Sequence, residues 1–472
     1  MRAVLTRDEM RAADAAALAT VSHETLVDRA GTAAGHAALR LLGGAYGRRV
    51  VVVVGKGSNG ADGRVAASFL ARRGARVRVM EAAAVVGGVT LPPCDLVVDG
   101  AYGTGFRGSY DAPGVPAGAR VLAIDIPSGV DADSGEAPGD AVRADRTITF
   151  AALKPGLVQG RGAVCSGAVE VADIGIGFPM PRALLVEDAD VALVPPRPRQ
   201  VNKWTTAVGV AAGSAGMEGA AILCSRGAMA AGAGMLRLGS PGNPTAAWPT
   251  EAVRMRLPAE DWAGAFLEAT AKCKAVVIGP GLGTAGATAE EIRAVIAAVP
   301  VPLVIDADAL TALGGVAAAR TLLDKRSAPS ILTPHDGEYA RISGAAPVED
   351  RLAAARHLAG ATGAVVLLKG PLTAVAAPGA AVPDVLLAAA GGPALATAGS
   401  GDVLSGVIGA FCARGLPPLE AAALAAHVHG RAASLGPAQG LVAGDLPALV
   451  ARFLSEPALA AERGDGEGDG RG

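Results

Sequence analysis

The segment Gly399-Ser-Gly401-Asp402 has the residue types of a phosphate-handling site. It precedes an apolar stretch that we expect to be helical, so its backbone N–H groups would lie at a helix N-terminus, where phosphate binds readily. A carboxylate beside such a site can accept the proton of an attacking hydroxyl while backbone donors stabilise the transferred phosphoryl group. The segment therefore predicts phosphoryl transfer, with Asp402 as the proton acceptor.

A second glycine-rich segment, Gly55-Lys-Gly-Ser-Asn-Gly60, follows an apolar run in the first half of the chain. With Glu81 about 20 residues further on, it fits the general fingerprint of dinucleotide-binding turns. Its continuation to Asp62 adds a carboxylate to the amide of Asn59. The alternative is that the glycines only permit a tight turn between strand and helix.

Two more loops of the first half carry acidic and hydroxyl groups directly after apolar runs. One begins at Asp99, and the other contains Asp125 and Ser128. Loops at the carboxyl ends of parallel strands meet in one crevice, so we expect these loops and the glycine turn to build a single site. For each aspartate, a role as helix cap or turn former remains the alternative.

Short apolar runs bounded by Gly or Asp predict a parallel sheet beneath these loops. A capping-box spacing, Thr6-Arg-Asp-Glu9, predicts a helix that runs toward Ala19. The first half therefore indicates an α/β fold with a Rossmann-like, doubly wound sheet. The expected strands are 50–54, 76–80, 96–98, 121–124 and 147–150.

The proline-rich segment Pro195–Arg199 interrupts this pattern, because proline can neither continue a helix nor join a central strand. We place the domain boundary there, with domains at 1–196 and 197–458. A tail, 459–472, rich in Gly and acidic residues, is expected to be disordered. The second domain is expected to be α/β as well, with strands at 208–212, 275–278, 303–305, 330–332 and 365–368.

Composition narrows the range of partners. A formal net charge of −2 argues against a nucleic-acid partner, and no apolar run of membrane-spanning length is free of Gly, Pro or charge. We therefore expect small-molecule ligands and a cytoplasmic location. A homo-oligomer is a separate expectation. The five cysteines lie far apart, which favours buried small hydrophobes over a disulfide framework or a zinc site.

Several segments of the first half together resemble the NAD(P)H-hydrate epimerase family. They are Leu26–Gly31, Ser58–Gly63, the Asp99 loop, Asp125-Ile-Pro-Ser128-Gly and Phe150-Ala-Ala-Leu-Lys154-Pro-Gly. The resemblance implies that Asn59, Asp99 and Ser128 hold a potassium ion. Oxygen ligands of mixed charge suit an alkali cation better than zinc, which prefers nitrogen and sulfur.

The same resemblance implies a pocket for hydrated nicotinamide dinucleotide, NADHX or NADPHX. Inversion of the hydroxyl-bearing ring carbon requires positioned proton transfer, and we expect Asp125 and Lys154 to supply the acid and base. The implied substrate-binding residues are Ser58, Asn59, Gly60, Ala61, Asp62, Gly103, Thr104, Gly105, Phe106, Arg107, Gly108, Ser109 and Asp125.

In the second half, the glycine loop and Leu368–Thr373 resemble the ribokinase-like family. The segments Gly213–Ala221, Gly279–Gly283 and Thr333–Glu338 narrow the resemblance to its NAD(P)H-hydrate dehydratase branch. Implied substrate contacts are Ala220, Gly281, His335 and Asp402, although His335 could instead be an ordinary helix-entry residue. The implied nucleotide-binding residues are Lys369, Gly370, Pro371, Leu372, Thr373, Thr397, Gly399, Ser400 and Gly401.

These resemblances imply metabolite repair in two steps. The first domain would interconvert the R and S epimers, and the second would phosphorylate the S form with ADP or ATP so that phosphate can leave and NAD(P)H is restored. Magnesium is expected to bridge the nucleotide phosphates.

Three other functions remain open. They are a small-molecule kinase of the same fold, a non-catalytic binding scaffold in the first half, and a Rossmann dehydrogenase that uses intact NAD. The last lacks a recognisable substrate domain for hydride transfer.

Overall fold

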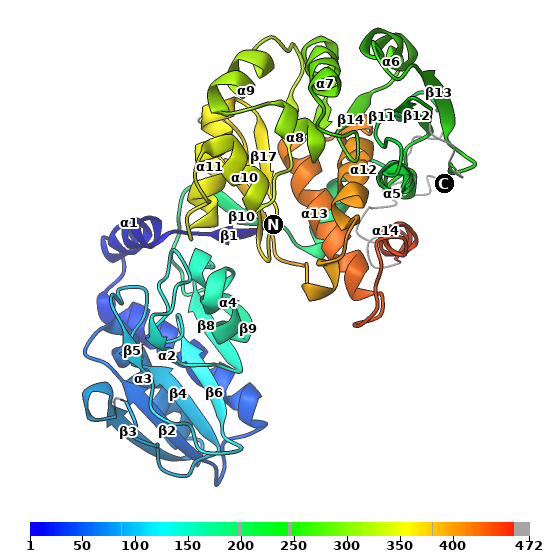
Figure 1. Cartoon of the computed structure of the whole chain (residues 1–472). Coiled ribbons are helices and arrows are strands. Elements are labelled where there is room, and N and C mark those ends of the chain that lie inside the picture. Colours follow the sequence, from blue (N-terminus) through cyan, green and yellow to red (C-terminus); the bar gives the residue numbers. More distant parts are fainter. Residues whose placement is uncertain (86, 197–200, 244–247, 380, 457–472) are drawn as a thin grey trace, which may run out of the picture. The chain divides into compact units, whose positions relative to one another are not determined.

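Residues 1–85, 87–196, 201–243, 248–379 and 381–456 are described by a computed structural model (Figure 1). It divides the chain into one unit of Arg2–Arg182 and another formed by Met1 and the chain from Ala183 onward. The boundary predicted after residue 196 therefore falls inside the second unit, because residues 183–185 pair with a strand of that unit. Residues 197–199 of the proline-rich segment and the tail 459–472 lie outside the described residues.

The first unit is built on a six-stranded parallel sheet in the order β3-β2-β4-β6-β8-β9. The chain passes from β2 to β3 on one side and then to β4 on the other, so the crevice at the carboxyl ends of β2 and β4 is the expected ligand site of such a sheet. The strands are β1 (Arg2–Val4), β2 (Arg49–Val54), β3 (Arg76–Glu81), β4 (Leu96–Gly100), β5 (Tyr110–Asp111), β6 (Arg120–Ile124), β7 (Gly139–Asp140), β8 (Arg146–Phe150) and β9 (Ala168–Ala172).

Alternation along β2 explains how this sheet is covered. Val50, Val52 and Val54 share one core with α2 and α3, whereas Val51 and Val53 share another with connecting segments. Helices therefore pack on one face, and loops cover much of the other. The helices of this unit are α1 (Arg7–Leu18), α2 (His23–Leu42), α3 (Ser58–Ala71) and α4 (Gly160–Ser166), with short 3₁₀ turns η1 (Ala82–Ala84) and η2 (Pro155–Leu157).

The sheet of the second unit runs β10-β19-β18-β17-β16-β15-β14-β11-β12-β13. Only β18 is antiparallel to its neighbours in this series. The strands are β10 (Ala183–Leu185), β11 (Ala207–Ala211), β12 (Met235–Pro241), β13 (Val253–Leu257), β14 (Ala275–Ile278), β15 (Leu303–Ile305), β16 (Ser330–Leu332), β17 (Val365–Leu368), β18 (Thr373–Ala376) and β19 (Val385–Ala388).

One face of this sheet packs against α5, α12, α13 and α14 in a single hydrophobic core. The alternate residues Val276, Ile278 and Val366 are buried too, so both faces are covered. The helices are α5 (Glu218–Ala230), α6 (Ala263–Thr270), α7 (Gly286–Ala298), α8 (Asp308–Ala312), α9 (Val316–Leu323), α10 (Asp336–Ser343), α11 (Arg351–Thr362), α12 (Ser400–Ala413), α13 (Pro418–Ser434) and α14 (Leu446–Leu454), with η3 (Asp188–Leu193) and η4 (Pro393–Leu395).

The predicted α/β class, the parallel strand runs of both halves and the capping box of α1 are confirmed. The five cysteines are buried and free, as expected. Helix α1 begins as the capping box predicts, because the Thr6 side chain accepts from the Glu9 N–H and the Glu9 carboxylate accepts from the Thr6 N–H.

Candidate functional sites

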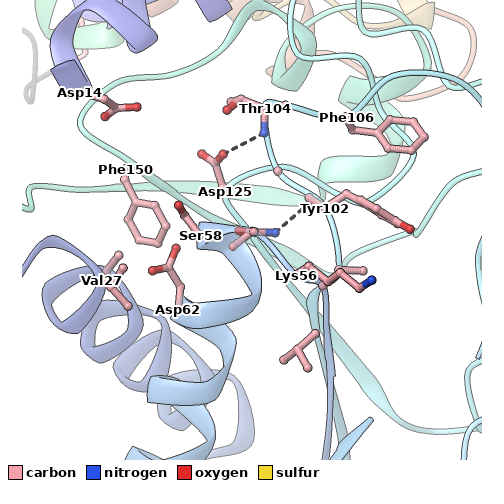
Figure 2. Close-up of a pocket in the computed structure, with 18 of the residues that line it drawn as sticks. Asp14, Val27, Lys56, Ser58, Asp62, Tyr102, Thr104, Phe106, Asp125 and Phe150 are labelled. Atoms are coloured by element: carbon pink, nitrogen blue, oxygen red, sulfur yellow. Dashed lines mark hydrogen bonds between the residues drawn. The ribbon is translucent and has the colours of Figure 1, made fainter. Parts of the chain in front are cut away.

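A cavity of about 940 Å³ lies at the carboxyl ends of the strands of the first unit. Its walls come from the turn after β2, the loop after β4, the end of β6 and the segment after β8, with α1 and α2 closing it (Figure 2). The loops predicted to converge therefore do so. Most of the lining is apolar, and several titratable groups project into it.

Asp125 and Lys154 form an ion pair in this cavity, with 2.7 Å between Lys154 Nζ and Asp125 Oδ1. Asp125 has a φ of +65°, and the N–H of Ile126 bonds back to the carbonyl of Ile124, so the chain turns sharply here at the end of β6. Aspartate tolerates this left-handed conformation better than most residues. The carboxylate also accepts from Thr104 N and Thr149 Oγ1, both at 3.2 Å.

Lys154 is almost completely buried, at 1% exposure. Its Nζ donates to Asp125, to Thr149 Oγ1 at 2.8 Å and to the Phe150 carbonyl at 3.0 Å. An ammonium group has three N–H donors, so all of them are used within the protein.

Two further carboxyl groups line the same cavity, Asp62 on α3 and Asp14 on α1. Burial, and then the negative charge of Asp125, raises the pKa of Asp62 to about 8. Burial also raises the pKa of Asp14, with Lys154 opposing it and Asp125 adding to it. Figure 2 shows Asp14, Asp62 and Asp125 around the ring of Phe150.

Asn59, Asp99 and Ser128 are brought together around the backbone of Tyr102. Asn59 Nδ2 donates to the Tyr102 carbonyl at 2.9 Å, and the Tyr102 N–H donates to Ser128 Oγ at 2.9 Å. Ser128 in turn donates to both oxygens of Asp99. Burial raises the pKa of Asp99, although these hydrogen bonds oppose the shift. The buried Oδ1 atom of Asn59 has no hydrogen-bond partner among the described residues.

The predicted substrate-binding residues of this unit divide into two groups. Among those that do not line the cavity, Arg107 pairs with Asp131 at 3.0 Å and Ser109 donates to the Pro138 carbonyl. Ser58, Asn59, Asp62, Gly103, Thr104, Gly105, Phe106 and Asp125 line it, whereas Gly60, Ala61, Arg107, Gly108 and Ser109 are outside its lining.

Sequence reasoning missed Asp14, Thr149 and Arg7. Arg7 is 2% exposed, donates to the Thr104 carbonyl at 2.5 Å and pairs with Asp131 at 2.8 Å. It thereby fixes the loop whose Thr104 N–H reaches Asp125. The capping box predicted where α1 begins but not which of its side chains point inward.

In the second unit, Gly399 ends the glycine turn and α12 begins at Ser400. Gly399 has a φ of +88°, a conformation that favours glycine. Asp402 therefore lies in the first turn of α12, beside N–H groups that have no partner within the helix. Burial raises the pKa of Asp402 to about 7, with Asp306 and Asp308 adding to the shift and Lys369 opposing it.

Lys369 is held between two carboxylates, with its Nζ 3.0 Å from Asp306 and 3.7 Å from Glu338. Burial lowers the pKa of Lys369, but these carboxylates raise it by more. Asp306 also accepts from Ser405 Oγ of α12 at 2.6 Å. The pKa of Asp306 is lowered, because Lys369 and these hydrogen bonds outweigh the effect of burial. Sequence reasoning missed Asp306 and Ser405.

The other predicted residues of this unit occupy different settings. A Cβ added at Gly281 would lie 3.0 Å from Ala220 Cβ, so these two are neighbours. His335 is the N-cap of α10, where its Nδ1 accepts from the N–H groups of Gly337 and Glu338. The Thr397 carbonyl accepts from Ser400 N in the glycine turn.

The segment after β17 is partly buried. Leu372 is 2% exposed. The Thr373 hydroxyl bonds to the Gly370 carbonyl, and Pro371 lies between these residues. A Cβ added at Gly401 would lie 3.5 Å from Lys369 Nζ, which brings the glycine turn next to this lysine.

None of the helices in the described ranges is both long enough and apolar enough to cross a lipid bilayer.

Known families match both units. A family described as NAD(P)H-hydrate dehydratase matches residues 208–455, and one described as YjeF-related protein N-terminus matches residues 23–86 and 80–156. A crystal structure of the ADP/ATP-dependent NAD(P)H-hydrate dehydratase from Bacillus subtilis, co-crystallised with ATP and Mg²⁺, is 29% identical. The match covers 57% of this chain and 96% of the Bacillus subtilis chain, with a TM-score of 0.46.

Relatives that share the full two-unit length are known as well. The bifunctional NAD(P)H-hydrate repair enzyme Nnr of Mycobacterium leprae is 40% identical over 481 residues, which covers 94% of this chain and 96% of the relative. The enzyme of the same name from Escherichia coli K12 is 32% identical, covering 89% and 88%. With these relatives and a dehydratase match over more than half of its length, the chain belongs to the family of bifunctional NAD(P)H-hydrate repair enzymes.

Proposed function

We propose that the two sites perform consecutive steps of one repair. The first unit interconverts the R and S epimers of hydrated NADH and NADPH, and the second dehydrates the S form at the expense of ADP or ATP. The observation that carries this proposal is Asp402, a carboxyl group at the start of α12 whose pKa is raised to about 7. A proton acceptor with such a pKa works well at neutral pH.

Dehydration begins with the ring hydroxyl, which is a poor leaving group. Its oxygen attacks the terminal phosphorus of the nucleotide, an O–P bond forms, and the bond to the nucleotide's leaving phosphate oxygen breaks, while Asp402 accepts the hydroxyl proton. The new phosphate then departs with the C–O electron pair. Loss of a proton from the neighbouring ring carbon restores the dihydronicotinamide double bond.

The chain's own groups would hold the two ligands of this step. Lys369, now paired with Asp306 and Glu338, is close enough to the glycine turn to meet a phosphate. The substrate contacts that we propose are Ala220, Gly281, His335 and Asp402. The proposed nucleotide contacts are Lys369, Gly370, Pro371, Leu372, Thr373, Thr397, Gly399, Ser400 and Gly401.

Magnesium belongs to this proposal because phosphoryl transfer needs neutralisation of phosphate charge. Its ligands would be mainly phosphate oxygens and water. Within the described ranges, no three His, Cys, Asp or Glu side chains form a group that could hold a metal ion. Asp306 and Glu338, the carboxylates bonded to Lys369, could each add an oxygen ligand once Lys369 turns to a phosphate.

Potassium is proposed for the Asn59–Asp99–Ser128 cluster. The cluster fits a cation for two reasons: the buried Oδ1 of Asn59 lacks a donor, and burial destabilises the charge of Asp99. A weakly hydrated cation would bind the Asn59 oxygen and balance the charge of Asp99. When bound, it would neutralise negative charge beside the loop that carries Thr104.

For epimerisation we propose that Asp125 is the base and that Lys154, which donates to it, positions its carboxylate. The Asp125 carboxylate accepts hydrogen bonds from Lys154, Thr149 and Thr104. It is therefore suited to take a proton from water or from the substrate hydroxyl, while Lys154 stabilises its charge.

A cytoplasmic location and a homo-oligomer stay predictions.

The test is incubation of the pure protein with a mixture of NADHX epimers, with and without ADP. Full recovery of NADH absorbance with ADP, and none without it, supports both steps. Recovery of NADH from only the S portion would support the dehydratase activity and not the epimerase activity. Nucleotide consumption with a stable phosphorylated product and no NADH would contradict the proposal and indicate a small-molecule kinase.

A further inference from the structure

Epimerisation needs a proton donor that the Asp125–Lys154 pair does not offer. Lys154 spends its N–H donors on Asp125, Thr149 and Phe150 and is 1% exposed. Asp125 accepts hydrogen bonds from three groups and is the base in the proposed function. The substrate hydroxyl, however, must gain a proton before its C–O bond can break.

Asp62 is the carboxyl group placed to provide that proton. It projects from α3 into the cavity and is 6% exposed. Asp62 and Asp125 line the same cavity from different elements, and Figure 2 shows the Asp62 carboxyl group beside the ring of Phe150. Within the described part of the chain, the Asp62 carboxyl accepts no hydrogen bond and forms no ion pair that would hold it ionised.

The electrostatic surroundings favour a neutral Asp62. Burial is the first cause of its raised pKa, about 8, and the charge of Asp125 is the second. Two neighbouring carboxyl groups, one ionised and one neutral, form the usual arrangement of a catalytic base and acid. The other titratable groups that line the cavity are Asp14, His23, Lys56, Glu81, Tyr102 and Lys154.

We propose that Asp62 is the proton donor of the epimerase, acting across the cavity from Asp125. The inference rests on the proposed assignment of the epimerase to this cavity. It gives Asp62 a catalytic role beyond the substrate contact expected from the resemblance.

The hydroxyl-bearing carbon of the hydrated ring is bonded to the ring nitrogen. Asp62 protonates the hydroxyl, the C–O bond breaks, and water leaves with its electron pair while the nitrogen lone pair forms a C=N⁺ bond. A second water then adds to the opposite face of the planar carbon, its proton passes to Asp125, and the C=N⁺ electrons return to nitrogen. Reversal with the other epimer, or exchange with solvent, resets both groups.

The test measures epimerisation of pure R-NADHX by the full chain without ADP, so that the dehydratase is idle, from pH 6 to 9.5. Wild-type kcat should fall as pH rises through about 8, because Asp62 must be protonated. Asp62→Asn should lose at least about 100-fold in kcat, with KM changed by only a few-fold, and should lack this alkaline limb. Asp14→Asn, which alters another carboxyl group of the cavity, should keep the limb.

Asp62→Glu retains an acid and should keep an alkaline limb at lower kcat, which tests the proposal even if the Asn variant does not fold. A folded Asp62→Asn variant that keeps the limb, or more than about a tenth of wild-type kcat, would overturn it. In that case Asp125→Asn decides the wider assignment: loss of epimerisation there would leave the proposed function standing and remove only the role of Asp62.

Discussion

Burial raises the pKa of Asp62, Asp99 and Asp402, but the local partners give each group a different use. Asp99 receives hydrogen bonds from Ser128 and suits a cation site. Lys369 opposes the rise in the pKa of Asp402, which is about 7 and therefore suits a proton acceptor at neutral pH. Among the described residues, neither a hydrogen-bond donor nor a cation opposes the raised pKa of Asp62, so its neutral form is favoured. The chemistry is thus decided by contacts between residues distant in sequence.

The pKa of Asp402 predicts how dehydration depends on pH. Because the acceptor must be unprotonated, the rate with pure S-NADHX and saturating ADP should fall about tenfold for each pH unit below about 7 and level off above it. Asp402→Asn should lose at least about 100-fold and the pH dependence with it. Asp324→Asn, a 54% exposed carboxylate of the same unit, is the control and should leave the profile intact. A wild-type rate that is flat between pH 5 and 8 contradicts this role.

The Asn59 cluster predicts a selective effect of potassium. Replacing K⁺ with tetramethylammonium, which is too large for the cluster, should slow epimerisation at least about tenfold and leave dehydration of S-NADHX unchanged. Potassium should also raise the melting temperature of the first unit, since it binds the folded form. Asn59→Leu should remove both responses. Equal epimerisation rates in the two salts would show that the cluster holds no functional cation.

At the scale of elements, the N-terminus of α12 depends on the backbone conformation of Gly399. A Cβ there would lie 2.4 Å from Leu223 Cδ1, and the φ of +88° is one that L side chains rarely adopt. Gly399→Ala should therefore shift the turn and raise the KM for ADP at least about tenfold, with epimerisation unchanged.

Gly415→Ala is a matched control for that variant. Gly415 has a φ of +94° at the other end of α12, and no atom lies within 4 Å of an added Cβ. It carries the same conformational cost, about 1–2 kcal/mol, without moving the turn. A similar rise in KM for both variants would mean that general destabilisation, and not the turn, controls nucleotide binding.

The sequence predicted elements better than it predicted side-chain contacts. Continuous apolar runs such as 365–368 predicted buried strands. A strand that is covered on both faces of its sheet has few positions that tolerate a polar side chain. Strands β12 and β13 escaped notice, since Arg237, Arg254 and Arg256 interrupt their apolar pattern. Arg7 looks like a surface residue of a first helical turn, and its burial is explained by partners far away in sequence, Thr104 and Asp131.

The same limit applies to the sites. Loop motifs identified Asn59, Asp125 and Asp402, whose neighbours in sequence are distinctive. Asp14 and Asp306 have no such local signature, because they reach their sites through long-range packing and ion pairing.

At the scale of the whole molecule, the residues of the two proposed steps belong to different compact units. The cavity residues all lie within Arg2–Arg182, and Asp402, Lys369 and Asp306 lie beyond Ala183. A chain with one damaged site should therefore retain the other activity. The two activities are complementary, since one equilibrates the epimers and the other consumes the S form.

Two single-site variants, tested separately and mixed, show whether the two activities lie at separate sites. With an epimer mixture and ADP, Asp125→Asn should rapidly convert only the S portion to NADH, and Asp402→Asn should interconvert epimers without forming NADH. A mixture of the two variants should restore complete conversion, because the S epimer released by one protein is substrate for the other. If the mixed variants convert no more than Asp125→Asn alone, while each is folded, the assignment of separate epimerase and dehydratase sites to Asp125 and Asp402 is wrong.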